Sequence, residues 1–229
     1  MSLEELLDQR QDLWRGRTVS AATPPGVSTG FAALDAILPW RGWPPGALSE
    51  ILDNRPGGAF ALVQPALVRL SGQARWLLLV DPPWIPYAPT LFAAGVDLSR
   101  LAVVEAGKEA AWAAEQGLRS GACSAVLAWG GRWESAALRR LQLAAEAGNA
   151  MALLFRGEAA VRQHSPAALR LQVRPSIAGV EVTVLKQRGA RAGATLELPL
   201  WAEPDVLPSA ILPPRSFRRS CVNDEGDWK

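Results

Sequence analysis

The sequence predicts an α/β fold in which a mostly parallel, twisted sheet is flanked by helices. Short apolar segments typical of buried strands alternate along the chain with longer segments whose apolar residues recur at helical spacing. The stretch Gly46–Leu62 has the residues of a strand, a tight Gly/Pro turn and a helix start. Because this alternation favours right-handed crossovers, consecutive strands are expected to run parallel in one sheet.

The later elements continue the alternation in chain order. The strands expected in the parallel sheet are Trp76–Val80, Leu101–Val104, Ala125–Ala128 and Ala152–Phe155. The helices expected between them are Ala88–Ala94, Ala110–Arg119 and Ser135–Ala147. Later strands are expected to extend the sheet in antiparallel fashion near Ala168–Val173, Val180–Lys186 and Thr195–Leu198.

Two arms are expected to flank a core domain of residues 26–200. Residues 1–25 are predicted to form an amphipathic helix and a linker, because Ser2 and Glu5 make a capping box before an apolar stripe. The stripe packs either on the chain's own core or on a protein partner, and its candidate partner-binding residues are Leu3, Leu6, Leu7 and Trp14. The Pro-rich residues 201–229 are predicted to be a flexible tail, either an inert linker or a docking peptide.

Composition indicates a globular, cytoplasmic protein. The chain has 229 residues, of which 49% are hydrophobic and 20% are charged, a balance typical of a folded domain. Its apolar runs are shorter than the roughly 18 residues of a membrane span, and Glu4 and Glu5 oppose the positive charge of a secretory signal. Cys123 lies in a strand pattern and Cys221 in a polar tail, so no disulfide is expected. A net charge of +2 makes any contact with DNA weak or indirect.

The Gly/Pro turn lacks the residues that a phosphate-binding loop requires. A working loop follows G-x-x-x-x-G-K-[ST], with a lysine on the terminal phosphates and a hydroxyl on Mg²⁺. In this register Asp53 replaces the first glycine, Ala59 replaces the lysine and Phe60 replaces the hydroxyl residue, while Gly57 and Gly58 remain. Asp53 would place a carboxylate beside phosphate, and a lost charge partner costs about 2–5 kcal/mol. The chain is therefore expected to bind no nucleotide and no other cofactor.

Around this loop the sequence resembles RecA-type recombinases. The segments that carry the resemblance are Ser28-Thr29-Gly30, Leu34-Asp35, Gly42–Gly46, Glu50-Ile51, Val80-Asp81, Ala94–Asp97 and Arg119–Ala122. The family's water-activating glutamate corresponds to Pro83, its Mg²⁺-site aspartate to Trp129, and its switch residue to Arg156 or Gly157. The resemblance thus implies a RecA-like core that has become a pseudo-ATPase, with no catalytic residues.

Within that group the sequence is similar to the ImuA family. The similarity is carried by Leu38–Pro44, Asp81–Pro89, Leu118–Trp129, Leu138–Ala145 and Leu185–Gly189. It implies a non-catalytic accessory of an SOS-induced translesion DNA synthesis complex, associated with the nucleoid when DNA is damaged. The partners it implies are an ImuB-type Y-family polymerase homologue, RecA and an error-prone replicative polymerase paralogue.

Lys186 and Arg188 are a second set of candidate partner-binding residues. They alternate on one expected strand, so both side chains face the same side about 7 Å apart. In RecA-type filaments a K-x-[KR] pair at this strand reaches the neighbouring protomer's ATP, so the resemblance implies a pair that caps a RecA filament. The alternative is two solvated charges on an edge strand. Recombinases also pack their N-terminal helix on the neighbouring protomer, so the resemblance implies that the stripe with Leu3 can join copies of the chain.

The ten tryptophans gather in particular segments. Those near the degenerate loop and its expected neighbours are Trp40, Trp43, Trp84, Trp129 and Trp133. Their rings are expected to fill the vacated nucleotide pocket, although partner anchoring and base stacking are alternatives. The single histidine, His164, has no cluster of ligating residues at suitable spacing, so no metal site is expected.

A rival function comes from a second family of RecA-like pseudo-ATPases. The SulA-type cell-division inhibitors belong to this class and block the polymerisation of FtsZ. The N-terminal helix, its linker and the strand with Lys186-Gln187-Arg188 argue against this rival, because a compact inhibitor would not need them. An active RecA paralogue is disfavoured by the missing catalytic positions.

Overall fold

The structure, a computed structural model, describes residues 25–53, 56–130, 133–177 and 179–200. The expected N-terminal helix, with Leu3, Leu6, Leu7 and Trp14, lies outside the described residues, as does the expected tail 201–229. Within the described part of the chain, no helix is long and apolar enough to cross a membrane.

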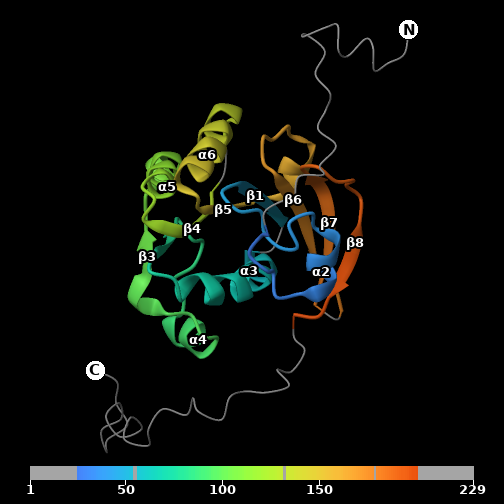
Figure 1. The fold of residues 1–229 in the computed structure, drawn as a ribbon, viewed down its shortest axis with the longest axis horizontal. Helices are drawn as coiled ribbons and strands as arrows, with labels where there is room; N and C mark the ends of the chain where they lie inside the picture. Colours follow the sequence, from blue (N-terminus) through green and yellow to red (C-terminus); the bar gives the residue numbers. More distant parts are fainter. Residues whose placement is uncertain (1–24, 54–55, 131–132, 178, 201–229) are drawn as a thin grey trace, which may run out of the picture.

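The described core is built around an eight-stranded sheet with the order β3-β2-β4-β5-β1-β6-β7-β8 (Figure 1). The strands are β1 (Leu48–Asp53), β2 (Trp76–Val80), β3 (Leu101–Val104), β4 (Cys123–Ala128), β5 (Met151–Arg156), β6 (Leu169–Pro175), β7 (Val180–Gln187) and β8 (Thr195–Leu198). The strands from β3 to β6 in this order pair in parallel, whereas β7 is antiparallel to both β6 and β8. The predicted α/β class with a mostly parallel sheet is confirmed.

Helices cover both faces of this sheet. The helices are α2 (Ala32–Ile37), α3 (Pro56–Ser71), α4 (Ala88–Ala93), α5 (Ala110–Arg119) and α6 (Ser135–Gly148), with short 3₁₀ turns η1 (Leu98–Arg100), η2 (Gly107–Glu109) and η3 (Glu158–Arg162). Helices α5 and α6 pack side by side on one face, and α3 lies on the other (Figure 1). Strands β4 and β5 are buried along their whole length, because both of their faces are covered.

One expectation about strand direction needs correction. The strand near Ala168–Val173 was expected to belong to an antiparallel extension, but β6 pairs in parallel with β1 and antiparallel with β7. The long connection from β5 through η3 makes this possible, because it returns the chain to the starting edge of the sheet before β6 begins. The antiparallel extension therefore begins with β7.

The motif Ser28-Thr29-Gly30 and the pair Leu34-Asp35 form one hydrogen-bonded unit at the start of the core. The Asp35 carboxylate accepts hydrogen bonds from Ser28 Oγ at 2.7 Å, Thr29 N at 2.9 Å and Thr29 Oγ1 at 2.7 Å. Gly30 has a φ of +87°, and a Cβ at this position would lie 2.4 Å from Cβ of Pro65 in α3. These residues therefore dock the first segment against α3.

A buried ion cluster joins the centre of the sheet to the connection before β6. Glu50, in β1, is 0% exposed and pairs with Arg156 of β5 at 3.1 Å and with Arg170 of β6 at 2.7 Å. Ser165 Oγ donates a third hydrogen bond to the carboxylate at 2.9 Å, and Arg170 Nη2 also donates to the carbonyl of Ala160 in η3 at 2.7 Å. The cluster fixes η3 over the ends of these strands.

Glu50→Gln is expected to lower the free energy of unfolding by about 3 kcal/mol or more, because it leaves two buried guanidinium groups without their carboxylate. Urea denaturation measures the loss. Glu115→Gln is the matched control: Glu115 pairs with Arg119 and Arg140, whose side chains are exposed, so its loss should be about 1 kcal/mol or less. Equal losses in the two variants would contradict the special role of Glu50.

Candidate functional site

The carboxyl ends of the parallel strands form a cavity where an α/β protein of this kind usually holds its ligand. Its volume is about 300 Å³. The residues that line it are Asp53, Ala59, Asp81, Pro83, Trp129, Gly130, Phe155, Arg156 and Gly157. The structure therefore brings together the positions that correspond to the loop, the two lost acidic residues and the switch.

Asp53 takes the place that phosphate would occupy at the start of α3. Its Oδ2 accepts a hydrogen bond from the backbone N–H of Ala59 at 3.3 Å. In a working phosphate-binding loop such N–H groups face the nucleotide. Gly57 and Gly58 lie in the first turn of α3, which follows β1 in the chain, and the Asp53 carboxylate contacts an amide of this helix.

Aromatic rings crowd the side of the cavity where Mg²⁺ and phosphate would lie. Trp129 stacks on Phe155 with ring centroids 4.6 Å apart and an interplanar angle of 4°. Phe60 lies 6.2 Å from Trp129 and 6.4 Å from Trp84, measured between ring centroids. Phe60, at the position of the lost hydroxyl residue, is thus packed against Trp129, at the position of a lost acidic residue.

The other tryptophans singled out in the sequence lie elsewhere. Trp40 and Trp43 belong to the core beside α2, where Trp43 forms an isolated bridge with Val27. Trp133 lies beyond Trp129, on the face of the sheet that carries α6. The expectation that tryptophans fill the nucleotide pocket therefore fits Trp84 and Trp129 and is wrong for Trp40 and Trp43, which are core residues.

Asp81 is a site residue that the sequence reasoning used as a landmark and did not name as a candidate. It has a φ of +50°, unusual for a residue with a side chain, and lines the cavity. Its Oδ1 accepts hydrogen bonds from the backbone N–H groups of Ala106 at 2.6 Å and Gly107 at 3.2 Å. The sequence signal was the aspartate at the end of a buried strand, directly before two prolines.

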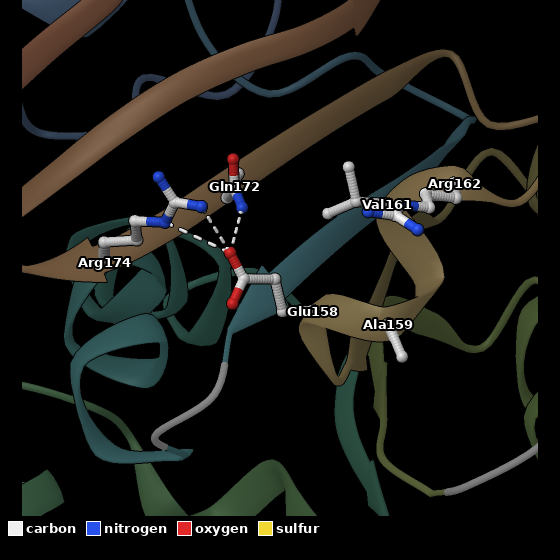
Figure 2. A pocket seen from close by; sticks show the side chains of 6 residues that line it. All are labelled: Glu158, Ala159, Val161, Arg162, Gln172 and Arg174. Carbon is white, nitrogen blue, oxygen red and sulfur yellow. Dashed lines mark hydrogen bonds and ion pairs between the residues drawn. The ribbon is translucent and has the colours of Figure 1, made fainter.

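Two larger cavities flank η3. One, of about 650 Å³, lies next to the nucleotide-type cavity and shares Gly130, Arg156 and Gly157 with it. The other, of about 580 Å³, lies on the far side of η3. Figure 2 shows that Glu158 projects there toward β6, where its Oε1 accepts hydrogen bonds from Gln172 Nε2 at 2.5 Å and Arg174 Nη2 at 2.5 Å.

Lys186 and Arg188 are engaged by the chain itself. Lys186 Nζ donates a hydrogen bond to the Ser165 carbonyl at 2.7 Å, and Arg188 lies 3.7 Å from Glu146 of α6. Partial burial lowers the pKa of Lys186, and the guanidinium of Arg170 lowers it further. Strand β7 lies between β6 and β8, but β8 pairs only with its first half, from Val180 to Thr183, so the segment that carries Lys186 has β6 as its one strand neighbour among the described residues.

Metal binding receives no support from the described residues. Among them, no group of three or more His, Cys, Asp or Glu side chains could hold an ion. Cys123 is a free, buried cysteine at the start of β4, and burial raises the pKa of its thiol.

Comparisons with known proteins identify the family. A family model described as "Cell division inhibitor SulA" matches residues 46–152. The cell division inhibitor SulA of Pseudomonas aeruginosa is 35% identical over 117 residues, which cover 49% of this chain and 73% of the relative. The chain belongs to the SulA family. The SulA of Edwardsiella piscicida is 40% identical over 97 residues, or 41% of this chain, and the match spans just 57% of that relative's length.

Two solved structures are similar to this chain to different degrees. The crystal structure of SulA from Pseudomonas aeruginosa has 33% sequence identity and a TM-score of 0.42, covering 49% of this chain and 99% of that chain. The RadB recombinase has 16% identity and a TM-score of 0.56, covering 74% of this chain and 93% of that chain. The likeness to RadB shows that the described core has a RecA-like fold.

Membership of the SulA family corrects the expected partners. An ImuB-type polymerase homologue, RecA and an error-prone polymerase paralogue were expected, but the relatives that the chain matches are cell-division inhibitors. The error has a physical reason: motifs such as Ser28-Thr29-Gly30 and Leu34-Asp35 build a hydrogen-bonded part of the fold, and a fold does not specify a partner. The inferred capping of a RecA filament by Lys186 and Arg188 falls with it.

Trp129→Ala is expected to lower the free energy of unfolding by about 3–5 kcal/mol, because it removes a buried ring that packs against Phe155 and Phe60. Urea denaturation measures the effect. Trp112→Ala, on the surface of α5 with 61% exposure, is the control and should change stability by about 0.5 kcal/mol or less. A similar small effect at Trp129 would show that the aromatic cluster does not hold this edge together.

Proposed function

We propose that the chain is a non-enzymatic inhibitor of bacterial cell division, produced in the SOS response, that binds FtsZ and prevents its polymerisation. The observation that carries the proposal is the 35% identity to a SulA over 117 residues that cover 73% of that relative. The matched region includes β1 to β4 and their helices, and so most of the cavity at the carboxyl edge.

The residues at this edge support a binding role without ATP hydrolysis. Pro83 and Trp129 offer no group that could activate water or hold a metal-bound water. The Asp53 carboxylate accepts the hydrogen bond of the Ala59 backbone N–H. The stacked ring of Phe155 adds apolar surface where a nucleotide would need charge. We infer that the chain is a pseudo-ATPase that acts through protein contacts.

Exposed apolar side chains beside this edge support a protein partner. Ile85 is 90% exposed, and Tyr87 and Phe92 are also exposed. All three follow β2, in the loop before α4 and in α4 itself, and lie within the matched residues 46–152. Contiguous exposed apolar groups of this kind commonly mark protein-binding surfaces. This group of side chains, the Ile85 surface, is our candidate for the contact with FtsZ.

Expression of the chain in a bacterial host is expected to produce long, undivided cells, because FtsZ that is bound to the chain cannot assemble a division ring. Cell length under the microscope measures the effect, and sedimentation measures FtsZ polymer in vitro. The double variant Ile85→Ser, Tyr87→Ser should bind FtsZ about tenfold or more weakly. Leu143→Ser, at an exposed apolar position of α6, is the matched control and should behave like the parent chain.

A second proposal, a non-catalytic role in damage-induced translesion synthesis, is supported by the resemblance to ImuA. It is favoured by the part of the chain beyond the SulA match, where β6, β7 and β8 continue the sheet after residue 152. Normal division on overexpression, together with a loss of damage-induced mutations in a deletion strain, would favour this role over FtsZ inhibition.

The chain is expected to show no saturable, Mg²⁺-dependent binding of a fluorescent ATP analogue at micromolar concentrations. The reason is the missing lysine at Ala59 and the carboxylate of Asp53 at the loop. Equilibrium fluorescence titration measures it, with an active recombinase as the positive control. Micromolar binding that disappears with EDTA would overturn the pseudo-ATPase assignment.

A further inference from the structure

Arg156, at the end of β5, is a buried guanidinium group whose hydrogen bonds are incomplete. Its side chain is 3% exposed, Nη1 donates to Glu50 Oε1 at 3.1 Å, and Nη2 donates to Gln163 Oε1 at 2.5 Å. Its Nε is buried and has no hydrogen-bond partner among the described residues. A buried charged donor without an acceptor is costly, so this atom marks a place where an acceptor is missing.

The surroundings of Arg156 also carry more positive than negative charge. The buried carboxylate of Glu50 faces two buried guanidinium groups, those of Arg156 and Arg170. Lys186 lies beside them, and the positive charge of Arg170 contributes to the lowering of its pKa. The positively charged groups of the described ion cluster therefore outnumber its carboxylate.

A cavity is available next to this group. The cavity of about 650 Å³ is lined by Arg156 and Gln163 together with Trp133 and the backbone of η3. A Cβ built on Gly157 would meet nothing within 4 Å, so the wall is open there. Gln163 accepts from Arg156 through Oε1, which leaves its amide N–H groups as donors.

The cavity on the other side of η3 shows how the chain itself satisfies such a pair of donors. There an amide, from Gln172, and a guanidinium, from Arg174, both donate to the carboxylate of Glu158 (Figure 2). The cavity at Arg156 has the same two donor types, from Gln163 and Arg156, but Glu134, the one carboxylate residue among its lining residues, accepts no hydrogen bond from either of them. The donors of one cavity therefore have the Glu158 carboxylate as their acceptor, whereas the donors of the cavity at Arg156 share no such carboxylate among the described residues.

We propose that the cavity lined by Arg156, Gln163 and Trp133 binds a carboxylate group, the side chain of an aspartate or glutamate presented by a protein partner. The planar group carries a negative charge, which reduces the excess positive charge of the ion cluster, and its two oxygens accept from the Arg156 guanidinium and a Gln163 amide N–H. Glu134 also lines the cavity, and its carboxylate would repel a phosphate dianion more strongly than a singly charged carboxylate. The assignment to a protein partner rests on the proposed function; the carboxylate site itself does not.

The site is tested first with acetate as the probe and the full chain in solution. Titration with sodium acetate at constant ionic strength should shift the Arg156 Nε–H and Trp133 indole N–H signals in ¹H–¹⁵N spectra in a saturable manner. Sodium chloride should not reproduce the shift, and sodium phosphate should bind more weakly. The absence of a saturable acetate shift, or tighter binding of phosphate, would overturn the proposal.

Two substitutions then test the donors. Gln163→Leu, at an exposed position, should weaken acetate binding at least about tenfold, a factor that corresponds to 1.4 kcal/mol. Arg156→Lys keeps a charge opposite Glu50 but removes Nε, and the Trp133 signal should report the same weakening. Gln172→Leu is the matched control, since it makes the same change in the other cavity and should leave acetate binding unchanged. Equal affinity for acetate in the parent and both cavity variants would refute the site.

The occupant is tested with FtsZ. Gln163→Leu should weaken FtsZ binding about tenfold or more if a partner carboxylate enters the cavity. Acetate binding by a parent chain that fails to bind FtsZ would support the carboxylate site and overturn the proposed function. FtsZ binding that Gln163→Leu leaves unchanged would overturn the assignment of the site to this partner.

Discussion

The ion cluster around Glu50 is the interaction on which the functional edge of the molecule depends. One carboxylate in the central strand connects β5, β6 and the connection between them, through Arg156, Arg170 and Ser165. These partners are 106, 120 and 115 residues away from Glu50 in the chain. Because the bonds cross strands that are neighbours only in the folded sheet, they form when the sheet forms, and they hold η3 in place.

At the same edge, apolar packing stands where other proteins of this fold hold a ligand. Trp129 packs against both Phe155 and Phe60, and the Asp53 carboxylate accepts a hydrogen bond from the backbone N–H of Ala59. Aromatic packing of this kind stabilises the folded state without any bound molecule. The edge therefore has a packed apolar surface in the folded chain itself.

Much of the fold could be predicted from the sequence because its strands are short apolar runs with clear boundaries. The predicted bounds of Trp76–Val80, Leu101–Val104 and Thr195–Leu198 agree with β2, β3 and β8. The pairing of β6 with β1 could not be predicted, since strand direction is set by the path of a connection and not by local pattern. The sequence indicated both the degenerate loop and the lost acidic positions, and the structure brings them to one cavity. The role of Glu50 was missed because its partners are distant in the sequence. The prediction of the partner was wrong because the motifs shared with RecA-type proteins specify the fold and do not specify a partner.

The edge strand β3 has a consequence for the behaviour of the molecule in solution. Within the described part of the chain, β3 ends the sheet, and its Val103 and Val104 are exposed. The strand has only four residues, and such a short edge offers few free backbone groups for strand addition by other chains. The shortness of β3 therefore protects the sheet from edge-to-edge pairing between copies of the chain, at an edge that has no part in the proposed contact.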